Sequence, residues 1–174
     1  MKTIKFSLLS LSFFCLLFNS CSLIDFDSTL KEWKSQNESY FTNMKDSTSY
    51  TFFTYPVSSG SISYYYKITT PGDENSVSPV IGDQVRVNYR GKLVNGNIFD
   101  QTFTTKVIDS NATPITLYDN EVISGWTYNL LQMKVGETRS VVLPQELGYG
   151  AQGQGAISPY STTIWVIQLV EVIH

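Results

Sequence analysis

The candidate site residues of this chain are aromatic side chains and one carboxylate. Phe99 is followed at once by Asp100 at the expected end of a strand, which puts the carboxylate at the rim of any cavity that the ring lines. Tyr149 stands between Gly148 and Gly150, so its ring has little local packing and its hydroxyl is free to meet a ligand. Asp100 could equally be a loop cap or the partner of a nearby arginine or tyrosine hydroxyl, and Tyr149 could only plug the mouth of the fold. These residues favour an apolar pocket with polar groups at its rim.

Other kinds of site are disfavoured. The only histidine is His174, the last residue, which argues against histidine acid–base catalysis, Ser-His-Asp triads and histidine-ligated metal sites. A Gly-x-Gly-x-x-Gly string covers residues 148–153, but Pro159 and another strand follow it rather than a helix, so we reject a dinucleotide site. We expect no cofactor and no metal ion.

Composition and charge narrow the partners. Aromatic residues make up 14% of the chain, with 11 Tyr and 10 Phe, which is enough to line a cavity. The formal net charge is −3, and losing the two positive charges of Lys2 and Lys5 with a signal peptide would make it about −5. No basic cluster is left in the rest of the chain, so we expect no nucleic-acid partner.

The N-terminus predicts export from the cytoplasm. Lys2 and Lys5 precede an apolar run over residues 6–18, which is typical of a signal peptide and too short for a membrane-spanning helix. We therefore expect residues 1–20 to be removed from the mature protein.

Cys21 is the expected site of a lipid anchor. Small residues before this cysteine resemble a bacterial lipoprotein cleavage site, which would make Cys21 the acylated first residue of the mature chain. The alternative is simple secretion with Cys21 unmodified. Cys15 leaves with the signal, so no disulfide is expected. The prediction is a lipid-anchored protein of the cell envelope, and Asp25 and Asp27 favour the outer membrane.

Residues 21–61 are expected to join the anchor to the main domain. Residues 22–27 form a short tether, and residues 28–45 form an amphipathic helix capped by Asp27 or Ser28. Its apolar stripe consists of Leu30, Trp33, Tyr40, Phe41 and Met44. We expect this helix to dock on its own domain, and a homodimer through the helix is the alternative. A short strand follows over residues 50–55.

Several strands are expected in residues 62–174. Apolar residues alternate with polar ones over residues 85–93, which predicts a strand with Tyr89 on its buried face. Asn95-Gly96 is a hairpin signal. Residues 162–172 are apolar on both faces, which indicates a central strand that points Trp165 into the same interior. Further strands are expected over residues 62–69, 114–118 and 139–143, with a flap over residues 102–113.

One helix is expected to pack its apolar face against this sheet. Trp126, Leu130 and Met133 share a face, with Ser124 as the N-cap and Gly136 as the C-cap. The glycine-rich loop over residues 144–161 is expected to be flexible.

Six ordered segments resemble the FKBP-type peptidyl-prolyl cis-trans isomerases. They are residues 85–93 (VRVNYRGKL), 95–100 (NGNIFD), 121–126 (EVISGW), 132–136 (QMKVG), 147–151 (LGYGA) and 164–172. The resemblance covers about residues 62–174 and implies an α+β fold, in which a bent antiparallel β-sheet wraps around one short helix and holds a proline pocket between them.

The resemblance also implies roles for individual residues. Tyr89, Phe99 and Trp165 would be side walls, and Trp126 the floor. The lip would consist of Val122 and Ile123, and the substrate-binding set would also include Ile115 and Ile157. The catalytic set would be the Ile123 backbone N–H, the Tyr149 hydroxyl and Asp100, all facing carbonyl groups of the substrate.

Two positions depart from the family pattern. Ile115 stands where a second aromatic wall is usual, and the loop after Tyr149 is one residue shorter and carries Gln154 where some relatives have histidine. We expect weaker affinity for macrolide immunosuppressants and an altered sequence preference.

The predicted function is isomerisation of X-Pro bonds in envelope or secreted polypeptides. The first alternative is a chaperone or binding module of the same fold with little catalysis. The second is a surface lipoprotein that binds glycans or peptides through its many tyrosines.

Overall fold

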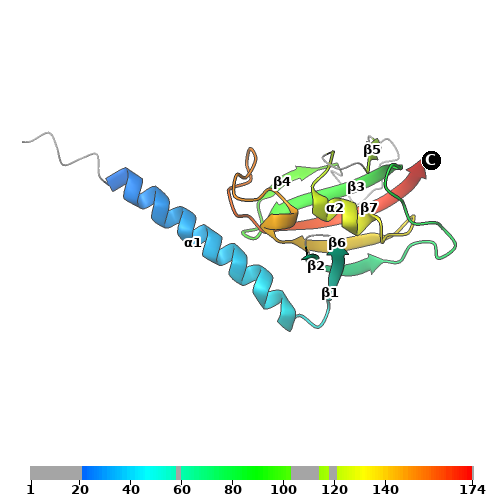
Figure 1. The fold of residues 1–174 in the computed structure, drawn as a ribbon, viewed down its shortest axis with the longest axis horizontal. Coiled ribbons are helices and arrows are strands. Elements are labelled where there is room, and N and C mark those ends of the chain that lie inside the picture. Colours follow the sequence, from blue (N-terminus) through cyan, green and yellow to red (C-terminus); the bar gives the residue numbers. More distant parts are fainter. Residues whose placement is uncertain (1–20, 58–59, 103–113, 118–120, 174) are drawn as a thin grey trace, which may run out of the picture.

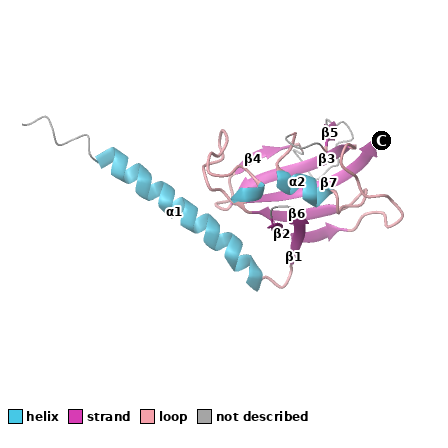
Figure 2. Cartoon of the chain, viewed as in Figure 1, coloured by secondary structure: helices cyan, strands magenta, loops and turns pink. Residues whose placement is uncertain are grey.

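The computed structural model describes residues 21–57, 60–102, 114–117 and 121–173. Seven antiparallel strands form one sheet, a short helix (α2) lies across one face of it, and a long helix (α1) extends away from it (Figure 1). Strands make up most of the regular secondary structure of the domain (Figure 2). The predicted signal peptide and nearly all of the predicted flap lie outside the described residues.

The sheet has the order β1-β2-β6-β7-β3-β4, with β5 paired to β3. The strands are β1 (Thr51–Val57), β2 (Gly60–Thr70), β3 (Gln84–Leu93), β4 (Ile98–Gln101), β5 (Pro114–Thr116), β6 (Thr138–Leu143) and β7 (Thr163–Ile173). The helices are α1 (Cys21–Asn43) and α2 (Ser124–Leu130), and two 3-10 turns are η1 (Met44–Asp46) and η2 (Gln145–Leu147). The expectation that residues 162–172 form a central strand is confirmed, because β7 lies between β6 and β3.

The main core lies between α2 and the sheet. Trp126, Leu130 and Met133 are buried there, as their shared face predicts. The predicted caps are wrong, however: Ile123 is the N-cap, and α2 ends at Leu130. Gly136 has a φ of 86° but lies in the turn before β6, where its N–H donates to Leu169 O at 2.7 Å. The positive φ of this turn, rather than a helix cap, therefore favours glycine here, and the hydrogen bond holds the turn to the central strand.

The helix α1 starts earlier than expected. Residues 22–27, predicted as a tether, are part of α1. They contain no glycine or proline that would interrupt a helix. No helix among the described residues is long and apolar enough to cross a membrane.

The second half of α1 docks on its own domain, as predicted. Asn37 is fully buried, its Oδ1 accepts from the Thr162 N–H at 2.8 Å, and its carbonyl accepts from the Thr162 hydroxyl at 3.1 Å. The Trp33 indole N–H donates to Ser161 Oγ at 3.2 Å. These bonds join α1 to the loop that leads into β7.

A smaller apolar cluster covers the opposite face of the sheet. Tyr65 points to that face because its neighbour Tyr64 points into the main core. The Phe41 ring of α1 packs against Tyr65 with 5.2 Å between the ring centroids. The helix therefore shields a sheet face that would otherwise meet water.

The strand β1 belongs to the sheet. It was assigned to the tether, but it pairs with β2 over residues 51–57 and 60–66. Pro56 is tolerated because β1 is an edge strand. The sheet therefore begins before the boundary expected at residue 62.

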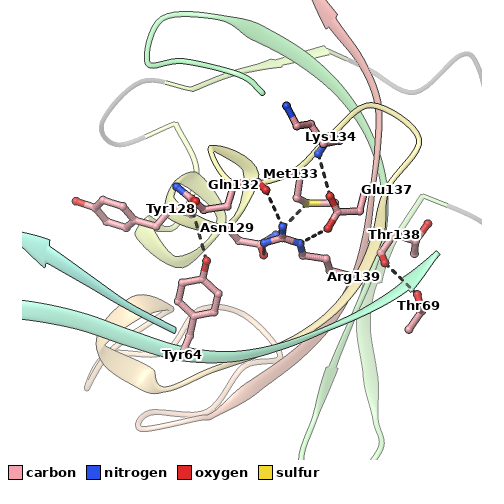
Figure 3. A network of polar contacts seen from close by, with 10 residues as sticks. All are labelled: Tyr64, Thr69, Tyr128, Asn129, Gln132, Met133, Lys134, Glu137, Thr138 and Arg139. Atoms are coloured by element: carbon pink, nitrogen blue, oxygen red, sulfur yellow. Dashed lines mark hydrogen bonds and ion pairs between the residues drawn. The ribbon is translucent and has the colours of Figure 1, made fainter. Parts of the chain in front are cut away.

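Two buried charges lie beneath the end of α2. Glu137 and Arg139 form an ion pair, and each side chain is only 5% exposed (Figure 3). The Glu137 carboxylate also accepts from the Lys134 N–H at 3.0 Å. The Arg139 guanidinium donates to Gln132 O at 2.6 Å and to Asn129 Oδ1 at 3.4 Å. The pair therefore satisfies polar groups where the helix stops.

We expect Arg139→Met to lower the free energy of unfolding by about 3–5 kcal/mol, because it leaves the Glu137 carboxylate buried without its cation. Urea unfolding measures the change. Arg86→Met is the matched control, since its pair with Glu171 is partly exposed, and it should cost at most about 1 kcal/mol. Equal losses for the two variants would contradict the prediction.

Candidate active site

A cavity of about 460 Å³ opens between α2 and the sheet. It is lined by Tyr89, Asp100, Ile115, Glu121, Val122, Ile123, Trp126, Tyr149, Gln154 and Trp165. Strands β3, β4, β5 and β7 supply one side, and the segment into α2 supplies the other. Residues far apart in the sequence therefore meet in one hollow, as expected of a ligand pocket.

Two indoles form the floor of the cavity. The rings of Trp126 and Trp165 lie edge to face, with centroids 5.0 Å apart and an interplanar angle of 82°. They are 5% and 2% exposed. The Tyr89 ring stands against Trp126 at 4.9 Å. The buried Trp126 Nε1 has no hydrogen-bond partner among the described residues, so the floor offers ring surface without a paired polar group.

The carboxylate at the rim is paired with a tyrosine. The Tyr89 hydroxyl donates to Asp100 Oδ2 at 2.8 Å, which is one of the two roles that the sequence left open for Asp100. Burial, followed by this hydrogen bond and the nearby charge of Asp100, raises the pKa of Tyr89 to about 12. Tyr89 is therefore a neutral donor at ordinary pH and holds the carboxylate in place.

Tyr149 lies in a compact loop rather than a flexible one. The Gly150 N–H donates to Gln145 O at 3.0 Å, and the Gly153 N–H donates to Tyr149 O at 3.1 Å. Gly153 has a φ of 66°, and a Cβ there would lie 2.2 Å from Ile157 O, so only glycine fits. Burial, and then the charge of Asp100, raises the pKa of Tyr149. The loop thus presents a neutral hydroxyl at the cavity.

The backbone N–H of Ile123 is available at the lip. Within the described part of the chain it donates to no acceptor, whereas the Ile123 carbonyl accepts from the Trp126 N–H at 2.9 Å. This arrangement follows from its place as the residue before α2, where backbone N–H groups lack helical partners.

The family comparison agrees with this geometry. The family model for FKBP-type peptidyl-prolyl cis-trans isomerases matches residues 75–170, more than half of the chain.

The chain belongs to this family.

Named relatives of the FKBP type are similar over the same region. The chain is 38% identical over 96 residues to the FKBP-type 22 kDa peptidyl-prolyl cis-trans isomerase of Escherichia coli K12, covering 55% of this chain and 44% of that protein. It is 35% identical over 108 residues to the peptidyl-prolyl cis-trans isomerase Mip of Coxiella burnetii, covering 62% of this chain and 44% of that protein. The chain thus spans less than half the length of these two relatives.

Solved structures share the FKBP fold. A peptidyl-prolyl cis-trans isomerase from Pseudomonas syringae superposes with a TM-score of 0.64 at 26% identity, over 83% of this chain and 96% of that one. FkpA from Escherichia coli gives a TM-score of 0.67 at 26% identity, over 87% of this chain and 64% of that one. The predicted fold class is therefore confirmed.

Two residues predicted to line the FKBP pocket do not line the cavity. Phe99 contacts two lining residues, with its ring 5.0 Å from Trp165 and 6.2 Å from Tyr149 between centroids. Ile157 is 6% exposed and exchanges backbone hydrogen bonds with Gln154. Phe99 supports the wall, and Ile157 closes the loop. The other predicted site residues all line the cavity.

Two lining residues were missing from the predicted site set. Glu121 accepts from the Thr116 N–H at 3.2 Å and so ties the lip to β5. Its position just before the lip could have indicated this role. Gln154 was noted only as a departure from the family, but it lies on the cavity wall.

The described residues that line the cavity do not form a metal-ligand set. Among the described residues, no three His, Cys, Asp or Glu side chains come close enough to hold a metal ion. The available chemistry is burial of an apolar group on the two indoles, with hydrogen bonds at the rim from Tyr149 and the Ile123 N–H.

We expect Asp100→Ala to lower the pKa of Tyr89 from about 12, but not to the ordinary 10.0, because burial is the larger cause. Carbon NMR of labelled tyrosines over a pH series measures the shift. Glu171→Gln, outside the cavity, is the control and should leave Tyr89 unchanged. An unchanged Tyr89 in Asp100→Ala would contradict the assigned hydrogen bond.

The raised pKa of Tyr89 makes the stability of the fold depend on pH. The folded chain keeps the Tyr89 proton between pH 10.0 and about 12, where the unfolded chain loses it. Its contribution to stability is therefore complete below pH 10.0 and falls as the pH rises through that window.

Proposed function

We propose that this protein catalyses cis–trans isomerisation of X-Pro bonds in polypeptide clients. The observation that carries the proposal is the cavity of about 460 Å³ whose floor is two buried indoles. Such a floor suits the apolar ring of a proline, and the rim offers hydrogen bonds to the carbonyl groups on either side of it.

Burial in this pocket would favour the twisted amide. Resonance gives the X-Pro bond a rotation barrier of about 18–20 kcal/mol, whereas its cis and trans forms differ by only about 0.5–1 kcal/mol. The planar amide has the larger dipole, so a cavity that removes water penalises it more than the twisted state. No nucleophile is needed, which suits a pocket whose lining is mainly aromatic and aliphatic.

The residues at the rim would complete the site. Ile123, through its free N–H, and Tyr149, through its neutral hydroxyl, can each donate to a substrate carbonyl. Asp100, held by Tyr89, would face the carbonyl carbon of the bond that twists. A millionfold acceleration requires about 8 kcal/mol, since each factor of ten requires about 1.36 kcal/mol. Desolvation of the amide and two hydrogen bonds to substrate carbonyl groups together supply a free energy of that order.

We expect Trp126→Ala to lower kcat/KM more than tenfold, because it removes the pocket floor, and Asp100→Ala to lower it about tenfold. A protease-coupled assay with a proline peptide measures both. Arg86→Met, outside the cavity, is the control and should retain wild-type turnover. Wild-type turnover no better than that of the two pocket variants would favour a chaperone or binding module instead.

We also propose that the protein lies in the cell envelope, held to a membrane by a lipid on Cys21. The support is the signal-like N-terminus and the cysteine that follows it. A homodimer through α1 stays a prediction, which sedimentation of the purified protein would test.

We expect Cys21→Ser to move the protein from the membrane pellet to the soluble fraction and to abolish incorporation of labelled palmitate, because the acylated residue is lost. Ser22→Ala is the matched control and should remain in the pellet. A Cys21→Ser protein that still pellets with membranes would contradict the anchor. Protease shaving of intact cells would then assign the side of the membrane.

A further inference from the structure

A second groove lies on the other side of the lip. It has a volume of about 770 Å³ and shares Val122 and Ile123 with the active-site cavity. Its remaining apolar lining is Tyr55, Ile81, Tyr128 and Leu131. We call it the outer groove.

The outer groove is aromatic and aliphatic, and no side chain that lines it is charged. The rings of Tyr55 and Tyr128 lie 5.0 Å apart between centroids, with an angle of 39°. Ile81 is 56% exposed, and Val77 and Val80 in the same loop are 59% and 60% exposed. Three large apolar side chains left in water within five residues indicate a surface that meets a partner.

The walls of the outer groove are held in place without a ligand. Tyr55 belongs to β1, where it pairs with Ile62 of β2. The loop that carries Ile81 is fixed on both sides, by the Gly82 N–H donating to Leu117 O at 3.2 Å and the Val80 N–H donating to Asp83 Oδ2 at 2.9 Å. Tyr128 belongs to α2. A preformed apolar groove can bind a side chain without first ordering its own walls.

We propose that the outer groove binds an aromatic or branched aliphatic side chain of the same polypeptide whose proline occupies the cavity. This inference rests on the proposed isomerase function. The two hollows share Val122 and Ile123 as lining residues and are therefore adjacent, so one extended chain can reach both. An extended chain advances about 3.3–3.6 Å per residue, so an apolar side chain within a few positions of the proline can reach an adjacent hollow. The preferred clients are therefore unfolded segments in which a proline lies near a large apolar residue.

Paired peptides test this proposal. One peptide has proline among alanines and serines, and the other has Phe or Leu two or three residues from the proline, on either side in turn. With the purified full chain, we expect kcat/KM to be about tenfold higher for the apolar peptide, mainly through KM. Tryptophan fluorescence titration with the same peptides reports binding whether or not turnover occurs.

The variants Ile81→Ser and Tyr55→Ser should abolish this preference and keep turnover of the polar peptide within about twofold of wild type. Ile98→Ser is the matched control, because Ile98 is 51% exposed but does not line the groove. It should retain the preference.

The outcomes separate the two proposals. Equal kcat/KM and equal affinity for both peptides, or a preference that survives Ile81→Ser and Tyr55→Ser, would overturn the role of the outer groove while leaving the isomerase intact. Turnover of neither peptide would overturn the isomerase, and the fluorescence titration would then decide the groove alone. A wild-type dimer that Ile81→Ser dissociates would make a second copy the occupant and would also overturn the inference.

Discussion

The contact between the indoles of Trp126 and Trp165 joins α2 to the central strand, and the pocket depends on it. The two rings meet edge to face at 5.0 Å, and both line the cavity. Phe99 reaches Trp165 only because Gly91 has no side chain, since a Cβ there would lie 2.5 Å from the Trp165 ring and 2.6 Å from Phe99. Packing against the floor therefore helps to set the geometry of the cavity.

Charged side chains are kept away from this floor or are paired at its rim. The charges of Glu137 and Arg139 are buried beneath the end of α2, where they pair with each other and make hydrogen bonds to backbone groups. At the rim, Asp100 has the Tyr89 hydroxyl as its donor. A cavity bounded in this way remains apolar, because an unpaired buried charge would draw in water at a high cost in free energy. The same arrangement supports a mechanism based on removing water from an amide.

The helix α1 contributes to the pocket although it lies outside it. Its Asn37 binds the backbone of Thr162, and the preceding Tyr160 donates its N–H to Gly150 O at 2.9 Å, next to Tyr149. Tyr160 has a φ of 63°, a conformation uncommon for a residue with a side chain. The ammonium of Lys34 in α1 lies 4.6 Å above its ring. A short series of contacts thus connects the N-terminal helix to the hydroxyl at the cavity.

Features that depend on local patterns could be predicted from the sequence. Alternating residues predicted the strands, residues 95–96 predicted a hairpin, and ordered segments identified the family and most of the cavity lining. The end of α2 could not be predicted, because Gly136 resembles a helix C-cap in the sequence. In the structure it lies in the turn before β6 and donates its N–H to Leu169 O, which is distant in the sequence. Phe99 was predicted as a wall, but Gly91 of β3 lets its ring pack against Trp165 instead. The outer groove exists because β1 pairs at the sheet edge, where Tyr55 meets Tyr128 of α2. These points depend on which distant residue occupies the neighbouring space, so local patterns could not predict them.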